Sequence, residues 1–451
     1  MNFIGLHAKS ALPSYAAAFA LIAMAYSPVT KAATLKVANC ADAGRGSLRD
    51  TVAIAASGDT LNLKYLRCNA IVLTSGQISI PQANLTLMGR RELTVDGNRN
   101  DRVFQHSGAG TLRIESLSLA NGYRVDSYAD GGCIESMGRV ELIRSDLHHC
   151  IAESTGGVES IRARGGGIFA TTGMLLSHSR VFANAAIPAG GGGGLYSSGH
   201  IRVYGSQVFD NETEDGGAIE GEAASIVYSR IDGNRAHGWG GAMVLSGNVT
   251  INKSTISNNH AEGYSGAIWL LNVERLLILD STISGNSAGN TSVGYLADET
   301  TISNSTIAFN HEEEAIEPCQ GALLAFQLHL ESSILSNNTC AAGIGLDIGG
   351  VQEFGYTLRG EDNLVGRSAL PVPADTIAAD PRLAPLADNG GPTPTHALRF
   401  GSPAINAGNN VLNRLYDQRG PGFPRTRGPR PDIGAIEYFG RTGPHRHDVP
   451  H

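Results

Sequence analysis

The sequence is poor in charge, and above all in lysine. Charged residues make up 17% of its 451 residues, against an average of about 25%. Only 5 of the 34 basic residues are lysine. Low charge combined with abundant glycine disfavours long helices and coiled coils. The formal net charge of −8 comes with no basic stripe along the chain, so we expect no nucleic-acid partner.

Long hydrophobic runs are also missing, apart from one near the N-terminus. The first 33 residues contain no acid, run apolar from Tyr15 to Tyr26, and end in the small residues Ala32 and Ala33. This pattern resembles a secretory signal peptide. No later stretch approaches the roughly 20 apolar residues of a transmembrane helix. We therefore expect residues 1–33 to be removed on export, leaving a chain without a transmembrane segment.

The six cysteines show no Cys-x-x-Cys spacing, so we expect no metal site. They form three sequence-local pairs, Cys40 with Cys68, Cys133 with Cys150, and Cys319 with Cys340. An even number of cysteines in an exported chain indicates disulfides. We expect these pairs to form three bridges, of which the second closes one coil upon itself.

Glycine is abundant, with 57 residues, but lacks the strict every-third-residue period of collagen. Short serine-to-asparagine segments recur instead at a period near 25 residues, which indicates stacked repeats. Seven copies end at Asn184, Asn211, Asn234, Asn259, Asn286, Asn310 and Asn337, and an eighth ends at Cys150. Glycine pairs precede several of them, as at 131, 166, 193, 216 and 240.

The segments between these turns alternate apolar and polar residues and are rich in β-branched side chains, as in Val249-Thr250-Ile251. This period predicts strands. Short strands joined by tight turns at a constant period can stack only in register, which predicts an all-β fold, a parallel β-helix with coils of about 25 residues. The recurring asparagines should form a ladder, and we attribute them to the left-handed turn conformation that asparagine tolerates.

Composition changes near residue 370, because 13 of the 18 prolines lie from Pro371 onward. We expect a solenoid of about thirteen coils over residues 34–370, a proline-rich cap over 371–440 that folds back on its open end, and a flexible tail over 441–451. The charged residues of the cap are expected to form structural ion pairs; these are Asp417, Arg419, Arg425, Asp432 and Glu437.

Three stretches resemble known families of bacterial exported right-handed β-helix proteins. The segment CADAGRGSLRDTVAIAASGDTLNL at 40–63 is similar to the CSLREA-type N-terminal segment, although Gly46-Ser47-Leu48-Arg49-Asp50 departs from it. The GGAI and FxxN elements resemble repeats of polymorphic outer-membrane proteins. DPRLAPLADNGGPTPTHAL at 380 and DIGAIEY at 432 resemble a choice-of-anchor Q domain. The resemblance implies a right-handed β-helix that is secreted or on the outer surface of a bacterium, and no defined reaction.

One set of turns stands out as a candidate site. ETED at 212–215, RAHGW at 235–239 and HAEGY at 260–264 follow three successive asparagines, so stacking should place them in one surface strip. Glu214, Asp215 and Glu262 are the catalytic candidates. His237, Trp239, His260 and Tyr264 are the ligand-binding candidates, since aromatic faces and polar groups suit sugar rings. A solvated loop surface is the plainer interpretation.

Two other polar features are interpreted as solvated surface. Lys253, the last lysine of the chain, is expected to point outward, and HEEEAIEP at 311–318 is expected to be an exposed insertion. The leading hypothesis is a non-catalytic protein that binds surface glycans, matrix or a surface protein, with no cofactor. A polysaccharide lyase or glycoside hydrolase using the strip is the alternative, and only a lyase would call for calcium. A purely structural rod is the third possibility.

Overall fold

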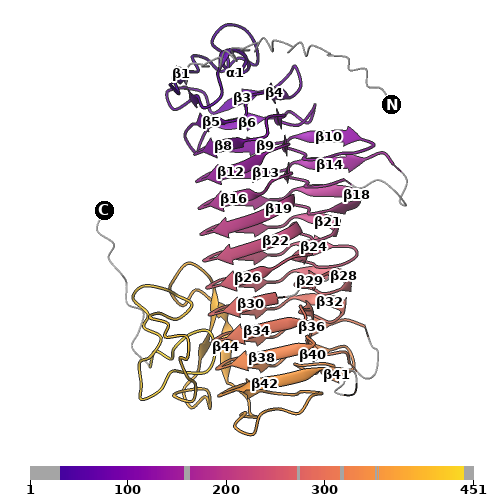
Figure 1. Cartoon of the computed structure of the whole chain (residues 1–451), viewed down its shortest axis with the longest axis vertical. Helices are drawn as coiled ribbons and strands as arrows, with labels where there is room; N and C mark the ends of the chain where they lie inside the picture. The colour runs from indigo at the N-terminus through magenta and orange to yellow at the C-terminus, as the bar shows by residue number, and fades with distance from the viewer. Residues whose placement is uncertain are drawn as a thin grey trace, which may run out of the picture.

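The computed structural model describes residues 31–156, 163–271, 275–314, 319–350, 353 and 355–440. Within them the chain is an all-β parallel solenoid of about 12 turns with coils of about 27 residues. Figure 1 shows the strands stacked one above another, with the C-terminal segment along one side. The predicted fold class is therefore confirmed. The predicted signal peptide lies almost entirely, and the predicted tail entirely, outside the described residues.

The strands lie in four rows, here numbered in the order in which the chain runs through them, and the first and last turns lack strands in some of the rows. Rows 1 and 2 share the long strands β19 (Leu195–Tyr204) and β22 (Ile219–Val227). The other strands of row 1 are β4 (Ile78–Ile80), β7 (Phe104–His106), β11 (Ile134–Ser136), β15 (Ile168–Ala170), β25 (Met243–Leu245), β29 (Ile268–Leu270), β33 (Gly294–Tyr295) and β37 (Leu323–Leu324). The other strands of row 2 are β1 (Thr34–Lys36), β2 (Thr60–Asn62), β5 (Leu85–Met88), β8 (Thr111–Glu115), β12 (Arg139–Ile143), β16 (Met174–Ser177), β26 (Val249–Asn252), β30 (Arg275–Leu279), β34 (Glu299–Ser303), β38 (Gln327–Glu331) and β42 (Thr357–Glu361).

Row 3 is a 12-stranded parallel sheet within the described residues, one strand fewer than the thirteen or so coils predicted. Its strands are β3 (Ala70–Val72), β6 (Thr94–Asp96), β9 (Ser118–Ala120), β13 (Asp146–His148), β17 (Arg180–Phe182), β20 (Gln207–Phe209), β23 (Arg230–Asp232), β27 (Thr255–Ser257), β31 (Thr282–Ser284), β35 (Thr306–Ala308), β39 (Ile334–Ser336) and β43 (Leu364–Val365). Row 4 contains β10 (Tyr123–Asp126), β14 (Ile151–Ser154), β18 (Ala185–Gly191), β21 (Glu212–Asp215), β24 (Arg235–Ala236), β28 (His260–Tyr264), β32 (Ser287–Asn290), β36 (His311–Glu312), β40 (Thr339–Cys340) and β41 (Gly343–Ile344).

The interior is filled by columns of aliphatic side chains, because alternate strand residues point inward. In row 3, Ile231, Ile256 and Ile283 stack in register, and all three are fully buried. Each such side chain contributes about 1.5–3 kcal/mol by leaving water. The one helix of the described residues, α1 (Leu48–Ile54), was not predicted from sequence. It begins at Ser47, whose side chain caps it, and buries Leu48 and Val52 against the first turns.

An asparagine ladder lines one corner of the solenoid. Each side-chain amide donates to the amide oxygen one turn on, as from Asn259 Nδ2 to Asn286 Oδ1 at 2.9 Å. The ladder begins at Cys150, whose backbone N–H donates to Asn184 Oδ1. At its other end, the Asn310 amide donates to Asn338, and the Asn338 amide donates to Asp347. The predicted final member was Asn337, which is wrong by one residue.

The conformational reason given for the ladder is also wrong. The left-handed conformation belongs to the residue before each ladder asparagine, such as Ala183, Asp210 and Asn258, and not to the asparagine itself. The ladder residues are buried, and their amides satisfy one another and neighbouring carbonyl groups. Asparagine is therefore required for hydrogen bonding in a buried corner, where an unpaired polar group would cost about 1–3 kcal/mol.

The three predicted disulfides are confirmed, with bridges between Cys40 and Cys68, Cys133 and Cys150, and Cys319 and Cys340. The second bridge joins residues 17 apart, within one turn. The other two span 28 and 21 residues, close to one period of the solenoid.

The C-terminal segment contains the antiparallel pair β44 (Leu383–Ala387) and β45 (Thr395–Leu398), and Figure 1 shows it beside the last turns. Its hydrogen bonds place it against row 3. Thr255 donates to the Pro394 carbonyl and Thr282 to Gln418, both from the outer face of that row. The segment thus covers the outer face of row 3, and Ile377 also pairs with Leu364 in the last turn. Two of the expected ion pairs are present, Arg419 with Asp417 and Arg425 with Glu437, all buried. Asp432 instead accepts the backbone N–H groups of Asn406 and Tyr438.

Candidate functional site

The predicted strip lies on the outer face of row 4. Glu212, Arg235 and His260 stand in register on three successive strands. His237 N–H donates to the Thr213 carbonyl, so Glu214, His237 and Glu262 share the next outward column within the predicted surface strip. The backbone positions of the predicted strip are therefore aligned on neighbouring strands.

The side chains of the strip bind one another. His237 Nε2 lies 2.9 Å from Glu212 Oε1, and its Nδ1 lies 2.9 Å from Glu262 Oε1. Arg235 reaches the same Glu262 oxygen at 2.6 Å. Partial burial opposes protonation of His237, but its hydrogen bonds to Glu262 and Glu212 raise its pKa overall. The hydrogen bonds from Arg235 and then His237 lower the pKa of Glu262. The result is a closed ion-pair network, in which Glu212, and not the catalytic candidate Glu214, contacts His237.

The three catalytic candidates have three separate environments. Asp215 is buried and accepts the Trp239 backbone N–H at 3.1 Å, so it holds the corner of the solenoid. Glu214 is exposed, and Glu262 is engaged by Arg235 and His237. His260 contacts Ser287 Oγ at 2.9 Å and Glu313 at 3.3 Å. Two of the three acids are thus engaged within the protein, Asp215 by the backbone and Glu262 by Arg235 and His237.

Two further polar features differ from expectation. Lys253 is buried, because its ammonium group donates to the carbonyls of Tyr416 and Asp417 at 2.6 Å each, under the C-terminal segment. Burial lowers its pKa, against the opposing charge of Asp280. In the acidic insertion, Glu312 is buried and accepts the Gln320 N–H, whereas Glu313 and Glu314 are exposed. Residues 315–318 lie outside the described residues.

Beside the strip, four aromatic side chains gather at the corner between rows 4 and 1. Trp239 stacks on Trp269, with ring centres 5.6 Å apart. Trp269 also meets Tyr264 at 5.8 Å and the edge of Tyr295 at 5.0 Å. Trp239 and Tyr264 are about 40% exposed, at 42% and 39%. We call Trp239, Tyr264, Trp269 and Tyr295 the aromatic cluster. Two of its members were sequence candidates, and Trp269 and Tyr295 were missed.

The aromatic cluster opens into a cavity on the outer face of row 1. This cavity has a volume of about 350 Å³. Its far wall is formed by Phe326 and Tyr356, which stack with ring centres 4.6 Å apart. Trp269, Tyr295 and the exposed Asp298 also line it. The Trp269 Nε1 donor is buried and has no hydrogen-bond partner among the described residues. The cavity thus carries apolar ring surface beside the exposed Asp298 carboxylate.

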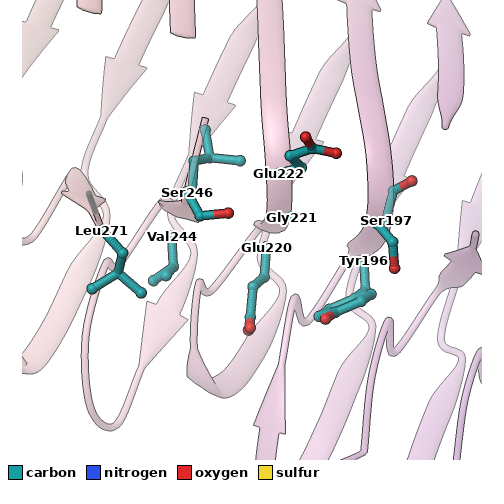
Figure 2. A pocket seen from close by; sticks show the side chains of 10 residues that line it. Tyr196, Ser197, Glu220, Gly221, Glu222, Val244, Ser246 and Leu271 are labelled. Atoms are coloured by element: carbon teal, nitrogen blue, oxygen red, sulfur yellow. The ribbon is translucent and has the colours of Figure 1, made fainter. Parts of the chain in front are cut away.

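A second cavity of about 320 Å³ lies on the same face, towards the N-terminus. Figure 2 shows Tyr196 and Glu220 pointing to the same side from adjacent turns, with Glu222 further along the same strand as Glu220. A Cβ at Gly221 would lie only 2.4 Å from the Ser197 carbonyl, so glycine is needed for the close approach of these turns. The remaining lining is small or aliphatic, comprising Ser197, Ser198, Val244, Leu245, Ser246 and Leu271.

The two cavities follow one another along row 1, since Leu271 lines the first and its neighbours Trp269 and Leu270 line the second. We call the pair the row 1 groove. From the turn of Tyr196 to that of Tyr356 it crosses seven turns, or about 29 Å at about 4.8 Å per strand. No group of three His, Cys, Asp or Glu side chains in the described part of the chain could hold a metal ion. No helix in that part is long and apolar enough to cross a membrane.

Neither a family model nor a curated protein matches this chain. Among solved structures it is similar to "Crystal structure of pectate lyase Pel9A", with a TM-score of 0.41 and 13% sequence identity. That comparison covers 91% of this chain and 98% of the other. Similarity at this level assigns neither a site nor a function.

Proposed function

We propose that this protein is a non-catalytic glycan-binding solenoid that holds an extended polysaccharide in the row 1 groove. The observation that carries the proposal is the aromatic cluster at the groove, continued by Phe326 and Tyr356. Aromatic rings provide apolar surface for the faces of sugar rings, and concave sites with a few polar groups fix the orientation of a ligand. The exposed Asp298 carboxylate supplies such a polar group.

A lyase or hydrolase remains the alternative, but the side chains favour binding. Hydrolysis of a glycosidic bond requires two carboxyl groups that flank it. Among the predicted acids, Asp215 is used by the backbone and Glu262 by Arg235 and His237. A lyase requires a base at the sugar ring, and Lys253 is held by the C-terminal segment, away from the groove.

We further propose that the chain acts outside the cell, secreted or attached to the outer surface of a bacterium. Its three disulfides support this, since such bonds persist in oxidising compartments. Residues 1–33 would direct export, 34–370 form the solenoid and 371–440 the C-terminal cap. The resemblance of the sequence to CSLREA-type, polymorphic outer-membrane and choice-of-anchor Q segments implies the same location. Adhesion to a glycan-coated surface is the role that fits this location.

The direct test is to incubate the disulfide-bonded chain with acidic, neutral and amine-bearing polysaccharides, with and without calcium. Binding would be followed by calorimetry and cleavage by the release of reducing ends and unsaturated products. We expect saturable binding of at least one polysaccharide and no product. Product release would establish the enzymatic alternative, whereas a folded chain that binds nothing would favour a structural rod.

A further inference from the structure

A third cavity lies between the C-terminal segment and the solenoid, and it shares no lining residue with the row 1 groove. Its volume is about 710 Å³, larger than either cavity of that groove. One wall comes from the segment around β44 and β45, and the other from the corner between rows 3 and 4 after β35 and β39. Cavities of about 300–1,000 Å³ between two structural units are typical of small-ligand sites. We call it the cap cavity; the side chains that give it its chemistry are Asp380, Arg382, Arg399, Phe400, Phe309 and Asn337.

The two arginines of the cap cavity have no acidic partner among the described residues. The Arg399 backbone N–H donates to the Arg382 carbonyl at 3.0 Å, so the two residues lie opposite each other beside the β44–β45 pair. Both side chains are exposed, and neither guanidinium group forms an ion pair or a hydrogen bond within the described part of the chain. A Cβ at Gly401 would lie only 2.9 Å from an Arg382 guanidinium nitrogen, so glycine at that position leaves room for this group.

Asp380 is the single acid in the lining of the cap cavity. Its Oδ1 accepts the Arg382 backbone N–H at 2.9 Å, and it forms no ion pair with the side chain of Arg382 or Arg399. The lining thus carries two positive charges and one negative charge, which leaves one positive charge in excess. A carboxylate on a ligand would balance that excess charge.

Two phenylalanine rings stand beside these charged groups. Phe400, next to Arg399 in the chain, is 83% exposed, and Phe309 is 41% exposed. Phe309 packs against the buried His396, with ring centres 5.0 Å apart, which fixes its position. The exposed Asn337, which does not enter the asparagine ladder, also lines the cavity. The rings offer apolar surface to the face of a sugar ring, and the amide offers a donor and an acceptor to its hydroxyl groups.

We propose that the cap cavity binds a sugar unit that carries a carboxylate, as a uronic acid does, and is a second glycan site of the chain. Arginine suits carboxylates because its guanidinium group donates two parallel hydrogen bonds, and such charge-assisted bonds are roughly twice as strong as neutral ones. Neutral glycans lack the group that these arginines would bind. The tests of the row 1 groove therefore use neutral glycans, and the cap cavity is tested with acidic sugars.

The test titrates the disulfide-bonded chain with glucuronate, glucose and inorganic sulfate, followed by calorimetry at pH 7, where the sugar carboxylate is ionised. We expect saturable binding of glucuronate. Glucose should bind at least about tenfold more weakly, since it forms no charge-assisted hydrogen bond with the arginines. Sulfate should also bind at least about tenfold more weakly, because it leaves both phenylalanine rings uncovered. Raising the salt concentration should weaken the binding of glucuronate.

A charge-matched pair of double variants locates the site. R382Q with R399Q removes both guanidinium groups from the cap cavity, whereas R67Q with R359Q removes two exposed arginines that line none of the three cavities. We expect the first pair to weaken glucuronate binding at least about tenfold and the second to change it less than about twofold.

Three results would overturn the cap cavity as an acidic-sugar site. These are equal affinities for glucuronate and glucose, sulfate binding as tight as that of glucuronate, and equal losses in the two double variants. A folded chain that does not bind glucuronate would overturn it as well. Binding of a neutral polysaccharide in the row 1 groove would stand in each case, so the two proposals fail separately.

Discussion

The strip on row 4 and the groove on row 1 lie on the same turns but differ in their side chains. The strip consists of charged side chains that pair with one another, whereas the groove is lined by aromatic rings. On row 4, oppositely charged side chains stand about 4.8 Å apart and pair across strands, as Arg235, His237 and Glu262 do. On row 1, aromatic rings pack side by side and leave apolar surface beside a cavity. In these turns the charges of row 4 pair with one another, whereas the aromatic rings of row 1 leave apolar surface beside a cavity.

The largest effect should follow from removing the centre of the aromatic cluster. We expect W269A combined with Y295A to weaken glycan binding at least about 100-fold, since buried aromatic anchors contribute about 2 kcal/mol or more each. The matched double variant in the strip, H237Q with E262Q, should change affinity less than about twofold. Calorimetry on both folded variants measures the contrast. A loss confined to the strip variant would place the ligand on row 4 and not on row 1, and comparable losses in both would mean that the ligand contacts both rows.

A smaller effect is expected at the border between the two surfaces. Trp239 and Tyr264 are more exposed than Trp269 and touch it from one side. W239A combined with Y264A should weaken binding about tenfold, because half of the ring surface remains. Y65A, which removes a 73% exposed tyrosine far from the groove, is the control. Unchanged affinity in the double variant would restrict the site to Trp269, Tyr295 and the residues beyond.

The smallest effect is a pH dependence confined to the strip. Folding raises the pKa of His237 above its ordinary value of 6.5, so protonation favours the folded state. The stabilisation is present in full below that value and is lost as the pH rises through the folded pKa. The pair is partly exposed, so the loss should stay below about 1 kcal/mol. Denaturant unfolding of the wild type and H237Q should converge as the pH rises, and a stability gap that widens would contradict the assignment.

Much of the fold could be predicted, because every turn of the solenoid repeats the same pattern of residues in the sequence. The serine-to-asparagine repeats placed the strands, and the cysteine spacings placed the disulfides. The single-residue error at Asn337 arose because two asparagines follow each other there. The backbone settles the choice, since Asn337 adopts the left-handed conformation with φ of 65° and Asn338 enters the ladder. Sequence spacing alone carries no such conformational information.

Long-range burial was the part that the repeat could not reveal. Lys253 lies at a turn that looks solvated within its own repeat, and the C-terminal segment, more than 160 residues later, covers it. Likewise, the contact from His237 to Glu212 instead of Glu214 depends on side-chain direction, which alignment of the turns does not specify.

The groove could have been found by aligning the repeats on their glycine pairs instead of their asparagines. In that alignment, the second residue of each row 1 strand points outward. In successive turns these residues are Phe169, Tyr196, Glu220, Val244 and Trp269. That outward column carries both the ring surface and one of the groove acids. Trp269 itself was hidden in the apolar run Ala267 to Leu271, where alternation between inside and outside is hard to read.

The most direct test of the central claim uses the protein's only two tryptophans, Trp239 and Trp269, which both belong to the aromatic cluster. Tryptophan fluorescence should be recorded while the disulfide-bonded chain is titrated with a glycan whose binding is measured in parallel by calorimetry. We predict a saturable change in intensity or wavelength that follows the calorimetric isotherm and is largely lost in W269F. Calorimetric binding with unchanged tryptophan emission would show that the glycan binds elsewhere, and it would contradict the account.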